Sequence, residues 1–250
     1  MTSSALPRPS ALGRLKEAAA PTRFAQSTRP ARRCAIAGAT FAALLCAALL
    51  LLDRIPALDA PTLDYLRFYL DGAGTLVTVG VYLVPLAGLA FLWFMFTLRE
   101  ALGRREDDAL VSGLQLGTGI AFLGLLFAGA AAVASAAFLQ HRTGIFPLHM
   151  EAIRAHTSLG YTLVFLYGVR MAGAFMIATT TLATRRGLMP MWLSVASYVA
   201  ALVLLIAASN NPAVLILMPA WTFAISLTIW AGSRTDATPA STTTESETDR

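Results

Sequence analysis

Long stretches without charged residues constrain this chain more than any other feature of its sequence. Six runs of about 18 residues or more contain no Asp, Glu, Lys or Arg, except for one arginine within the fourth run. An α-helix needs about 20 apolar residues to cross a hydrocarbon layer of about 30 Å. The sequence therefore predicts an all-α fold, a polytopic transmembrane helical bundle of about six spans. The predicted spans are residues 34–52, 74–97, 113–139, 157–182, 191–209 and 213–231.

Composition places these spans in one transmembrane domain, residues 33–232, between two polar tails. The chain is 56% hydrophobic and only 13% charged, whereas soluble domains carry about 25% charged residues. Residues 1–32 are basic and rich in Ser, Thr, Pro and Ala, and residues 233–250 contain no large apolar residue. Both tails are therefore predicted to be disordered. The first run is longer than the 7–15 apolar residues usual in a cleaved signal peptide, which favours an uncleaved span over that alternative.

The basic residues fall unevenly on the two sides of the predicted bundle. With the N-terminus inside, fourteen Lys and Arg residues lie on that side and four on the other, and seven of the fourteen precede the first span. Positive charge is enriched in the cytoplasmic segments of membrane proteins. Both termini are therefore expected in the cytoplasm. The same positions explain the net charge of +5 without nucleic acid, and no nucleic-acid partner is expected.

Arg170 is the one charged residue inside a predicted span. It lies about 18 Å or more from either end of the fourth span, which places it near the midplane of the bilayer. No Asp or Glu occurs in any span, so its partner must be neutral or an anion from elsewhere. Counting residues from the span ends puts Ser197, Tyr198 and Thr222 at the same depth, with Tyr167 one turn before Arg170. These five residues form the predicted ligand-binding site.

Two interpretations of Arg170 stay open. In the functional one, its guanidinium is the positive pole of a cavity that holds an anionic group such as a lipid phosphate or carboxylate. In the structural one, it is a satisfied residue that holds neighbouring helices together. Replacing Arg170 with Met distinguishes them, because the first interpretation predicts loss of binding and the second predicts loss of stability alone.

The three histidines give only a weak metal hypothesis. His149 and His156 are seven residues apart, so they lack the i, i+4 spacing of two zinc ligands on one helix. His141 and His156 lie at the outer ends of the third and fourth spans, where they can in principle face one haem iron. Solvated loop histidines are the simpler interpretation. No metal site and no cofactor are therefore expected.

Catalytic motifs are also missing from the sequence. There is no GxSxG, P-loop, GxGxxG or CxxC pattern, so no catalytic residue is predicted and a non-enzymatic protein is expected. The acidic cluster Glu106, Asp107 and Asp108 follows two arginines in a short loop, and it is predicted to be a solvated turn.

Small residues mark the third span as a candidate for close helix packing. It contains Gly113, Gly117, Gly119, Gly124 and Gly129, and helices in lipid associate through such residues because their backbones can approach closely. The third span is therefore predicted to be central, while the aromatic second span is predicted to face lipid. Small-residue faces also permit a homo-oligomer without requiring one.

A resemblance begins at about Pro147 and covers roughly 90 residues. The segments AHTSLGYTLVFLYGVRMAGAFMIATTTL and RRGLMPMWLSVASYVAALVLL resemble the C-terminal half of a family of uncharacterised six-span membrane proteins common in high-GC bacteria. That family has LGY near the start of one helix, a short basic loop and an LPxWLG-like segment. This chain departs from the family pattern by carrying Met189 before Pro190. It also has Ser194 at a position where the family usually has glycine. The resemblance implies a bacterial plasma-membrane protein and assigns no activity.

The leading functional hypothesis is a membrane protein that binds or moves a small amphiphile or anion within its bundle. Its partners are then the lipid bilayer and a lipid or small anion. One alternative is a structural or regulatory membrane subunit that recruits a cytoplasmic partner through its tails. The other is a haem or metal redox protein.

Overall fold

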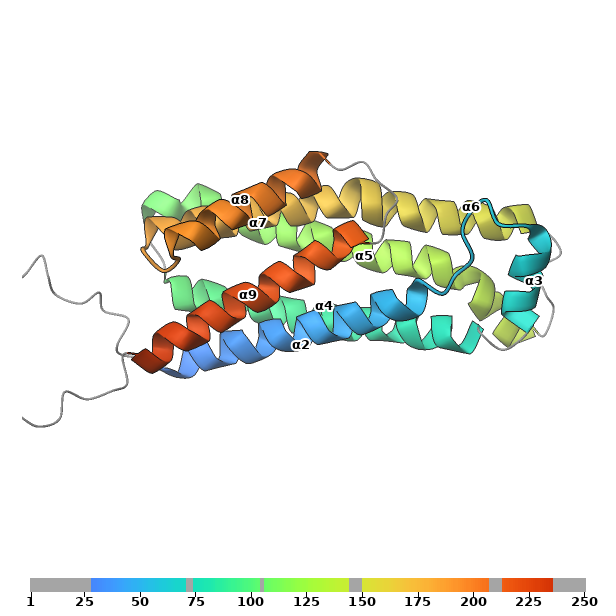
Figure 1. Ribbon diagram of the computed structural model, residues 1–250, viewed down its shortest axis with the longest axis horizontal. Helices are drawn as coiled ribbons and strands as arrows, with labels where there is room; N and C mark the ends of the chain where they lie inside the picture. Colours follow the sequence, from blue (N-terminus) through green and yellow to red (C-terminus); the bar gives the residue numbers. More distant parts are fainter. Residues whose placement is uncertain (1–27, 71–73, 104–105, 144–149, 207–212, 236–250) are drawn as a thin grey trace, which may run out of the picture.

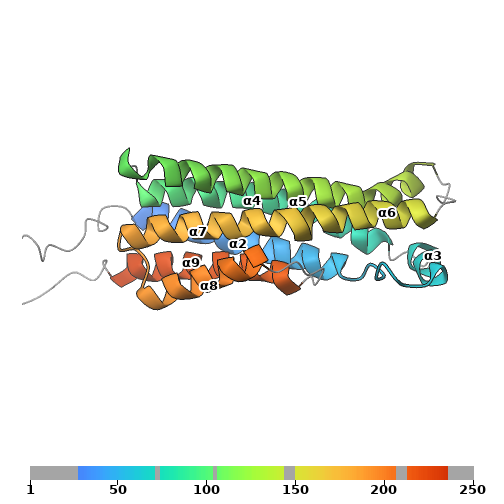
Figure 2. The ribbon, with the colours of Figure 1, turned by 90° about the horizontal axis from the view of Figure 1, so that it is seen from above.

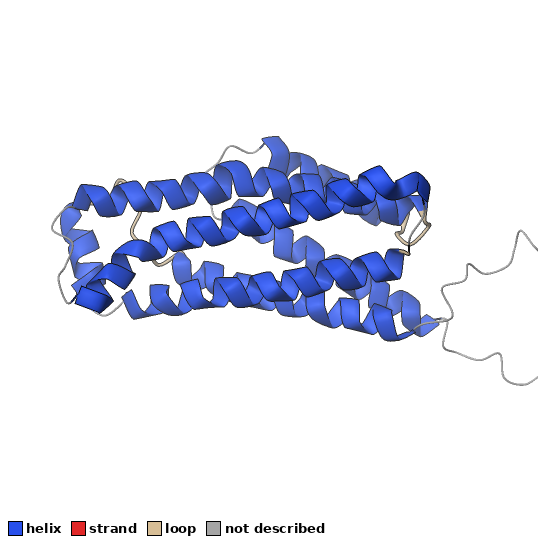
Figure 3. Ribbon diagram, turned by 180° about the vertical axis from the view of Figure 1, so that it is seen from behind, coloured by secondary structure: helices blue, strands red, loops and turns tan. Residues whose placement is uncertain are grey.

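The computed structural model of the chain describes residues 28–70, 74–103, 106–143, 150–206 and 213–235, and every regular element in these ranges is a helix (Figures 1 and 3). Two of these elements are short, a 3₁₀ turn η2 and a π-helix η3. In chain order the elements are α2 (Thr28–Leu52), α3 (Thr62–Leu70), α4 (Gly74–Leu102), η2 (Glu106–Asp108), α5 (Ala109–Thr143), α6 (Met150–Tyr161), η3 (Thr162–Gly168), α7 (Val169–Arg185), α8 (Met191–Ile206) and α9 (Ala213–Thr235).

Six helical segments correspond to the six predicted spans. Five are long and apolar enough to cross a bilayer, and the fourth of these is the continuous run of α6, η3 and α7. The remaining segment, α8, is apolar but has only 16 residues. The predicted all-α bundle of about six spans is thus confirmed, and the chain is a multi-pass membrane protein. Residues 1–27 and 236–250, which hold most of the two predicted tails, lie outside the described residues.

The long helices run roughly along one axis, so the bundle has two distinct ends (Figures 1 and 2). The terminal end holds the start of α2 and the end of α9, together with the α4–α5 connection and the α7–α8 turn. The opposite end, here called the α3 end, holds α3 and the start of α6. The α8–α9 hairpin stops well short of the α3 end (Figure 1). α2 packs mainly on α4 and α9, whereas α7 packs mainly on α5 and α8.

A cluster of aromatic rings forms the centre of the bundle. Phe91 of α4 lies 4.8 Å from Phe41, 5.1 Å from Phe175 and 5.6 Å from Phe122, measured between ring centroids. All four rings are fully buried, and contacts at these distances add to the stability that burial supplies. The prediction that the second span faces lipid is therefore wrong for one side of α4, although Trp93 on its other side is 49% exposed.

The glycines of α5 divide into two groups. A Cβ atom at Gly129 would lie 3.0 Å from the carbonyl oxygen of Gly160, which shows that the α5 and α6 backbones touch there. A Cβ at Gly113, Gly117 or Gly124 would meet nothing within 4 Å. A Cβ at Gly119 would clash with Met95 and lie 3.1 Å from Phe175 Cδ2. The close-packing prediction is therefore confirmed at Gly119 and Gly129 and does not hold at the three glycines on the outer face.

Candidate functional site

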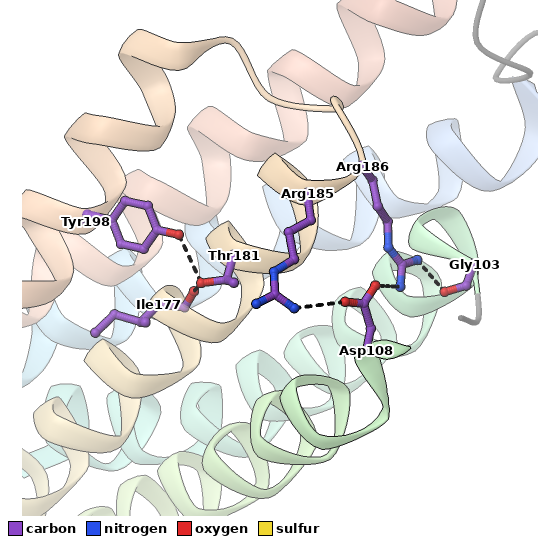
Figure 4. Close-up of polar contacts among 7 residues, drawn as sticks. All are labelled: Gly103, Asp108, Ile177, Thr181, Arg185, Arg186 and Tyr198. Atoms are coloured by element: carbon purple, nitrogen blue, oxygen red, sulfur yellow. Dashed lines mark hydrogen bonds and ion pairs between the residues drawn. The ribbon is translucent and has the colours of Figure 1, made fainter. Parts of the chain in front are cut away.

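An ion cluster ties three helix ends together at the terminal end of the bundle. The Asp108 carboxylate accepts a hydrogen bond of 3.0 Å from Arg186 Nη2 and one of 3.2 Å from Arg185 Nη1 (Figure 4). Arg186 also donates through Nη1 to the carbonyl oxygens of Leu102 and Gly103. Its side chain is only 8% exposed, whereas that of Arg185 is 56% exposed. Arg186, the residue that follows α7, thus caps the end of α4 and holds the start of α5.

Two glycines shape the backbone around this cluster. Gly103 and Gly187 have φ angles of +73° and +67°, a region that residues with a Cβ rarely adopt. At the end of α7, the Gly187 N–H donates to Thr184 O and the Leu188 N–H donates to Ala183 O, both at 3.0 Å. This is the Schellman pattern that terminates helices. Gly187 therefore forms the C-terminal cap of the fourth span.

Electrostatics favour this arrangement of charges. The hydrogen bond from Arg186 lowers the pKa of the Asp108 carboxyl most, burial opposes it, and Arg185 lowers the pKa further. The helix dipoles also stabilise these charges. The negative carboxylate of Asp108 lies at the start of α5, and the positive guanidinium of Arg186 lies at the end of α4. The prediction of a solvated turn at Glu106–Asp108 is therefore wrong for Asp108, although Asp107 is exposed. The signal that could have found the pair is the Arg–Arg dipeptide at the end of the neighbouring span.

Next to this cluster lies a cavity of about 420 Å³ between α4, α5 and α7, here called the basic cavity. Arg99, Arg186, Ser112 and Gln115 are among the residues that line it. Arg99 Nη2 donates to Ser112 Oγ at 3.0 Å, and Gln115 Nε2 donates to Thr179 Oγ1 at 3.0 Å. Within the described part of the chain, two buried atoms here lack a hydrogen-bond partner, Arg186 Nε and Gln115 Oε1.

A second, smaller cavity lies toward the α3 end. This apolar cavity has a volume of about 70 Å³ and is lined by residues of α2, α4, α5, α6, η3 and the start of α9. Along α2 its lining extends from Leu45 to Asp53, and Asp53 is the one ionisable acid among the lining residues. Tyr161 and Phe165, whose rings stack with centroids 5.4 Å apart, form part of the wall.

The wall of the apolar cavity includes a π-helix. Between residues 162 and 168 the chain winds with wider turns, and the Val169 N–H donates to Val164 O, five residues earlier. Such turns are rare and occur frequently at functional sites. Val164 and Phe165 of this segment both line the apolar cavity. The irregular backbone therefore sets the shape of that wall.

Arg170 lies just beyond this π-helix, in the first turn of α7. Its side chain is partly buried and donates through Nη1 to Leu166 O, one turn earlier in the same segment. A Cβ at Gly173 would lie 2.9 Å from Ala201 O and 3.1 Å from Leu205 Cγ, so Arg170 is level with the end of α8. Arg185 is fifteen residues, or about 22 Å, away at the terminal end.

The described helices do not fix the boundaries of the membrane, so the midplane position of Arg170 stays a prediction. Within the run of α6, η3 and α7, Arg170 lies level with the end of the described part of α8. Its bond to Leu166 O directs the guanidinium toward the α3 end, as in a snorkelling arginine.

The other predicted ligand-binding residues make their hydrogen bonds elsewhere. Tyr198 Oη lies 2.9 Å from Thr181 Oγ1, eleven residues along the helix from Arg170 (Figure 4). Ser197 Oγ accepts a hydrogen bond of 2.9 Å from Trp221 Nε1.

The remaining two are separated as well. Thr222 is fully buried and donates to Met218 O in its own helix at 2.9 Å, while Tyr167 is 53% exposed. The described hydrogen bonds thus join α7 to α8 and α8 to α9, and none joins these residues to Arg170.

The histidines provide no metal centre among the described residues, where no group of three potential metal ligands occurs. His156 is exposed, and its Nδ1 lies 2.7 Å from Ala152 O in its own helix. The side chain of His141 and the whole of His149 lie outside the described residues.

Comparison of the chain with family models, with curated proteins and with solved structures gives no match. The resemblance of the C-terminal segments to six-span proteins of high-GC bacteria stays a prediction.

Proposed function

We propose that this membrane protein binds a single-chain amphiphile whose alkyl chain occupies the apolar cavity. The observation that carries the proposal is an almost wholly apolar space between α2, α4, α5, α6, η3 and α9, with one carboxylate, that of Asp53, among its described lining residues. Ligand sites typically combine apolar walls with a few polar groups that fix orientation. The leading hypothesis from the sequence, a small amphiphile within the bundle, thus gains a specific location.

The dimensions of the cavity favour a chain over a ring. A cavity of about 150 Å³ holds benzene, and the apolar cavity has about 70 Å³. Leu45 and Asp53 both line it, and these residues are about 12 Å apart along α2. A space smaller than a benzene site takes only a short part of a linear hydrocarbon, so we expect one segment of the alkyl chain to enter it and the rest to extend outside.

The head group of the amphiphile is expected to be cationic or neutral. Asp53 is exposed at the end of α2 and its carboxylate lies where a head group would sit. A like charge there would be repelled, whereas an amine or hydroxyl can donate to it. We therefore assign an alkyl amine or alkyl alcohol as the ligand class.

Arg170 fits this function as a positioning residue. Its bond to Leu166 O fastens the first turn of α7 onto the π-helix, and that π-helix supplies Val164 and Phe165 to the cavity wall. The structural interpretation of Arg170 is thus the one we propose. The described contacts add no support for the regulatory-subunit and haem alternatives, and we propose neither.

Photolabelling in lipid nanodiscs tests the proposal. A dodecylamine that carries a photoreactive diazirine on its chain is expected to label peptides from η3 and the adjoining part of α5. Ala130 lines the cavity and is 8% exposed, so Ala130→Leu should fill the space. The added side chain competes with the ligand for the same space, so we expect about tenfold less labelling, which corresponds to about 1.4 kcal/mol of binding free energy.

Ala131→Leu is the matched control, because Ala131 is the next residue of α5 and is exposed. Its labelling should equal that of the wild type, and circular dichroism should show both variants folded. Equal labelling of the two variants would exclude the apolar cavity as the binding site. Efficient competition by a bulky adamantyl amine would contradict the size argument.

We also propose that the protein resides in a bacterial plasma membrane with both termini in the cytoplasm. The fourteen-to-four distribution of basic residues supports this orientation, and the described arginines of the ion cluster lie at the terminal end. Reporter fusions after residue 250 and within residues 56–60 should show cytoplasmic and external activity, respectively. The reverse pattern would overturn the orientation.

A further inference from the structure

We propose that the basic cavity is an anion site that binds a phosphate group at the terminal end of the bundle. This inference does not depend on the alkyl-chain site, which lies toward the other end and shares none of its lining residues. It also uses none of the ligand-binding residues predicted from the sequence.

Two guanidinium groups from different helices line the site. Arg186, which directly follows α7, is held in place because Nη1 donates to the Leu102 and Gly103 carbonyl oxygens and Nη2 donates to Asp108. Its Nε is buried and has no hydrogen-bond partner within the described residues. Arg99 of α4 donates to Ser112, which uses one of the five N–H donors of its guanidinium. Planar guanidinium forks match the oxygens of a phosphate group.

The charges around the cavity favour a singly charged phosphate. Arg185 and Asp108 lie beside the cavity and compensate each other. Among the described lining residues, Arg99 and Arg186 oppose one carboxylate, Glu100, which is exposed. The balance of the described lining is therefore one positive charge. A phosphate diester carries one negative charge and restores neutrality.

Unpaired buried atoms support a bound ligand rather than a simple solvated arginine. Arg186 Nε and Gln115 Oε1 are both buried without a hydrogen-bond partner in the described structure. A buried polar atom without a partner costs about 1–3 kcal/mol relative to a satisfied one. A phosphate with a hydroxyl-bearing substituent offers acceptors for the arginines and a donor for Gln115.

The surroundings of the cavity suit the head group of a lipid. Phe96 lines the cavity and is 58% exposed on the outside of α4, so an acyl chain can leave the site along an apolar surface. The volume of about 420 Å³ lies within the range of about 300–1,000 Å³ usual for ligand pockets. Basic pockets between helices at the cytoplasmic surface bind phosphate head groups in other membrane proteins.

Two sources share this chemistry, a phospholipid and a soluble phosphate, and one experiment separates them. Native mass spectrometry of the full chain would follow retention of dioleoylphosphatidylglycerol, with dioleoylglycerol as the phosphate-free probe. In a second arm, inorganic phosphate is titrated while the melting temperature is recorded. A lipid site predicts retained phosphatidylglycerol and no effect of phosphate, whereas a soluble-anion site predicts a phosphate-dependent rise in melting temperature.

Arg99→Gln should lower whichever signal is seen by about tenfold. Arg185→Gln removes the same charge at the same end from a residue outside the cavity lining, and it should retain the signal. If Arg99→Gln does not fold, Arg99→Lys keeps the charge but loses the fork, and it should show a smaller loss. Equal losses in Arg99→Gln and Arg185→Gln would overturn the site, as would equal retention of dioleoylglycerol or the absence of both signals.

Discussion

The contact between α5 and α6 makes the sharpest stability prediction. A Cβ at Gly160 would lie 2.7 Å from the carbonyl oxygen of Gly129, closer than real Cβ atoms come to backbone oxygen. In Gly160→Ala the two helices must separate, and overpacking of this kind costs about 1–3 kcal/mol. The same substitution gains about 1 kcal/mol of helix propensity, which partly hides the cost.

Gly124→Ala isolates the cost of separation. Gly124 lies in α5, and a Cβ added there would meet nothing within 4 Å. This variant should therefore gain the stability that comes from higher helix propensity, without any cost from separating two helices. Subtracting the two variants cancels the propensity term and leaves about 1–3 kcal/mol. At about 2–4 °C per kcal/mol for a domain of this size, Gly160→Ala should melt about 2–12 °C below Gly124→Ala.

Thermal unfolding in one detergent, followed by circular dichroism at 222 nm, measures this difference. SDS titration of both variants provides an independent ranking. Identical melting temperatures, or a more stable Gly160→Ala, would show that the α5 and α6 backbones do not touch at this point.

Three further predictions follow from single side chains. Arg170→Met should lower the melting temperature by about 2–4 °C through loss of the bond to Leu166 O, while alkyl-amine labelling persists; abolished labelling in a folded variant would instead support a direct ligand contact. Asp108 has a pKa below its unfolded value, so its ion pairs stabilise the protein above about pH 4 and are lost as the pH falls through the folded pKa; Asp108→Asn should remove this acid-dependent loss from pH-resolved melting curves. Ser197→Ala should cost about 0.6 kcal/mol, typical of a hydrogen bond in a membrane, and Trp221→Phe in that background should cost less than it does alone.

The six spans could be predicted because their signal is local. Each long uncharged run has one stable arrangement in lipid, in which the backbone bonds to itself. The cap at Gly187 is a local feature of the same kind, since a glycine after a basic helix end has a known geometry. These features depend on neighbours in the sequence and on no tertiary contact.

The contacts between helices could not be predicted in the same way. Counting residues from the span ends places Tyr198 at the depth of Arg170. In the structure Tyr198 instead lies against Thr181, which is eleven residues along the helix from Arg170. Asp108 was assigned to solvent because its loop is polar, yet Arg186 reaches it across 78 residues of sequence. Such pairings depend on the rotation and the axial offset of neighbouring helices, and the periodicity of a single sequence does not determine either of them.

The short α8 has a consequence for the lipids around the protein. Its 16 described residues rise about 24 Å, compared with about 30 Å for a typical hydrocarbon layer. A leaflet beside an apolar segment shorter than the layer thins locally, at a fraction of a kcal/mol for each ångström. The five longer helices have the length to cross a full layer, so we expect any such thinning beside α8. Short-chain lipids are then expected to be enriched on that side of the protein.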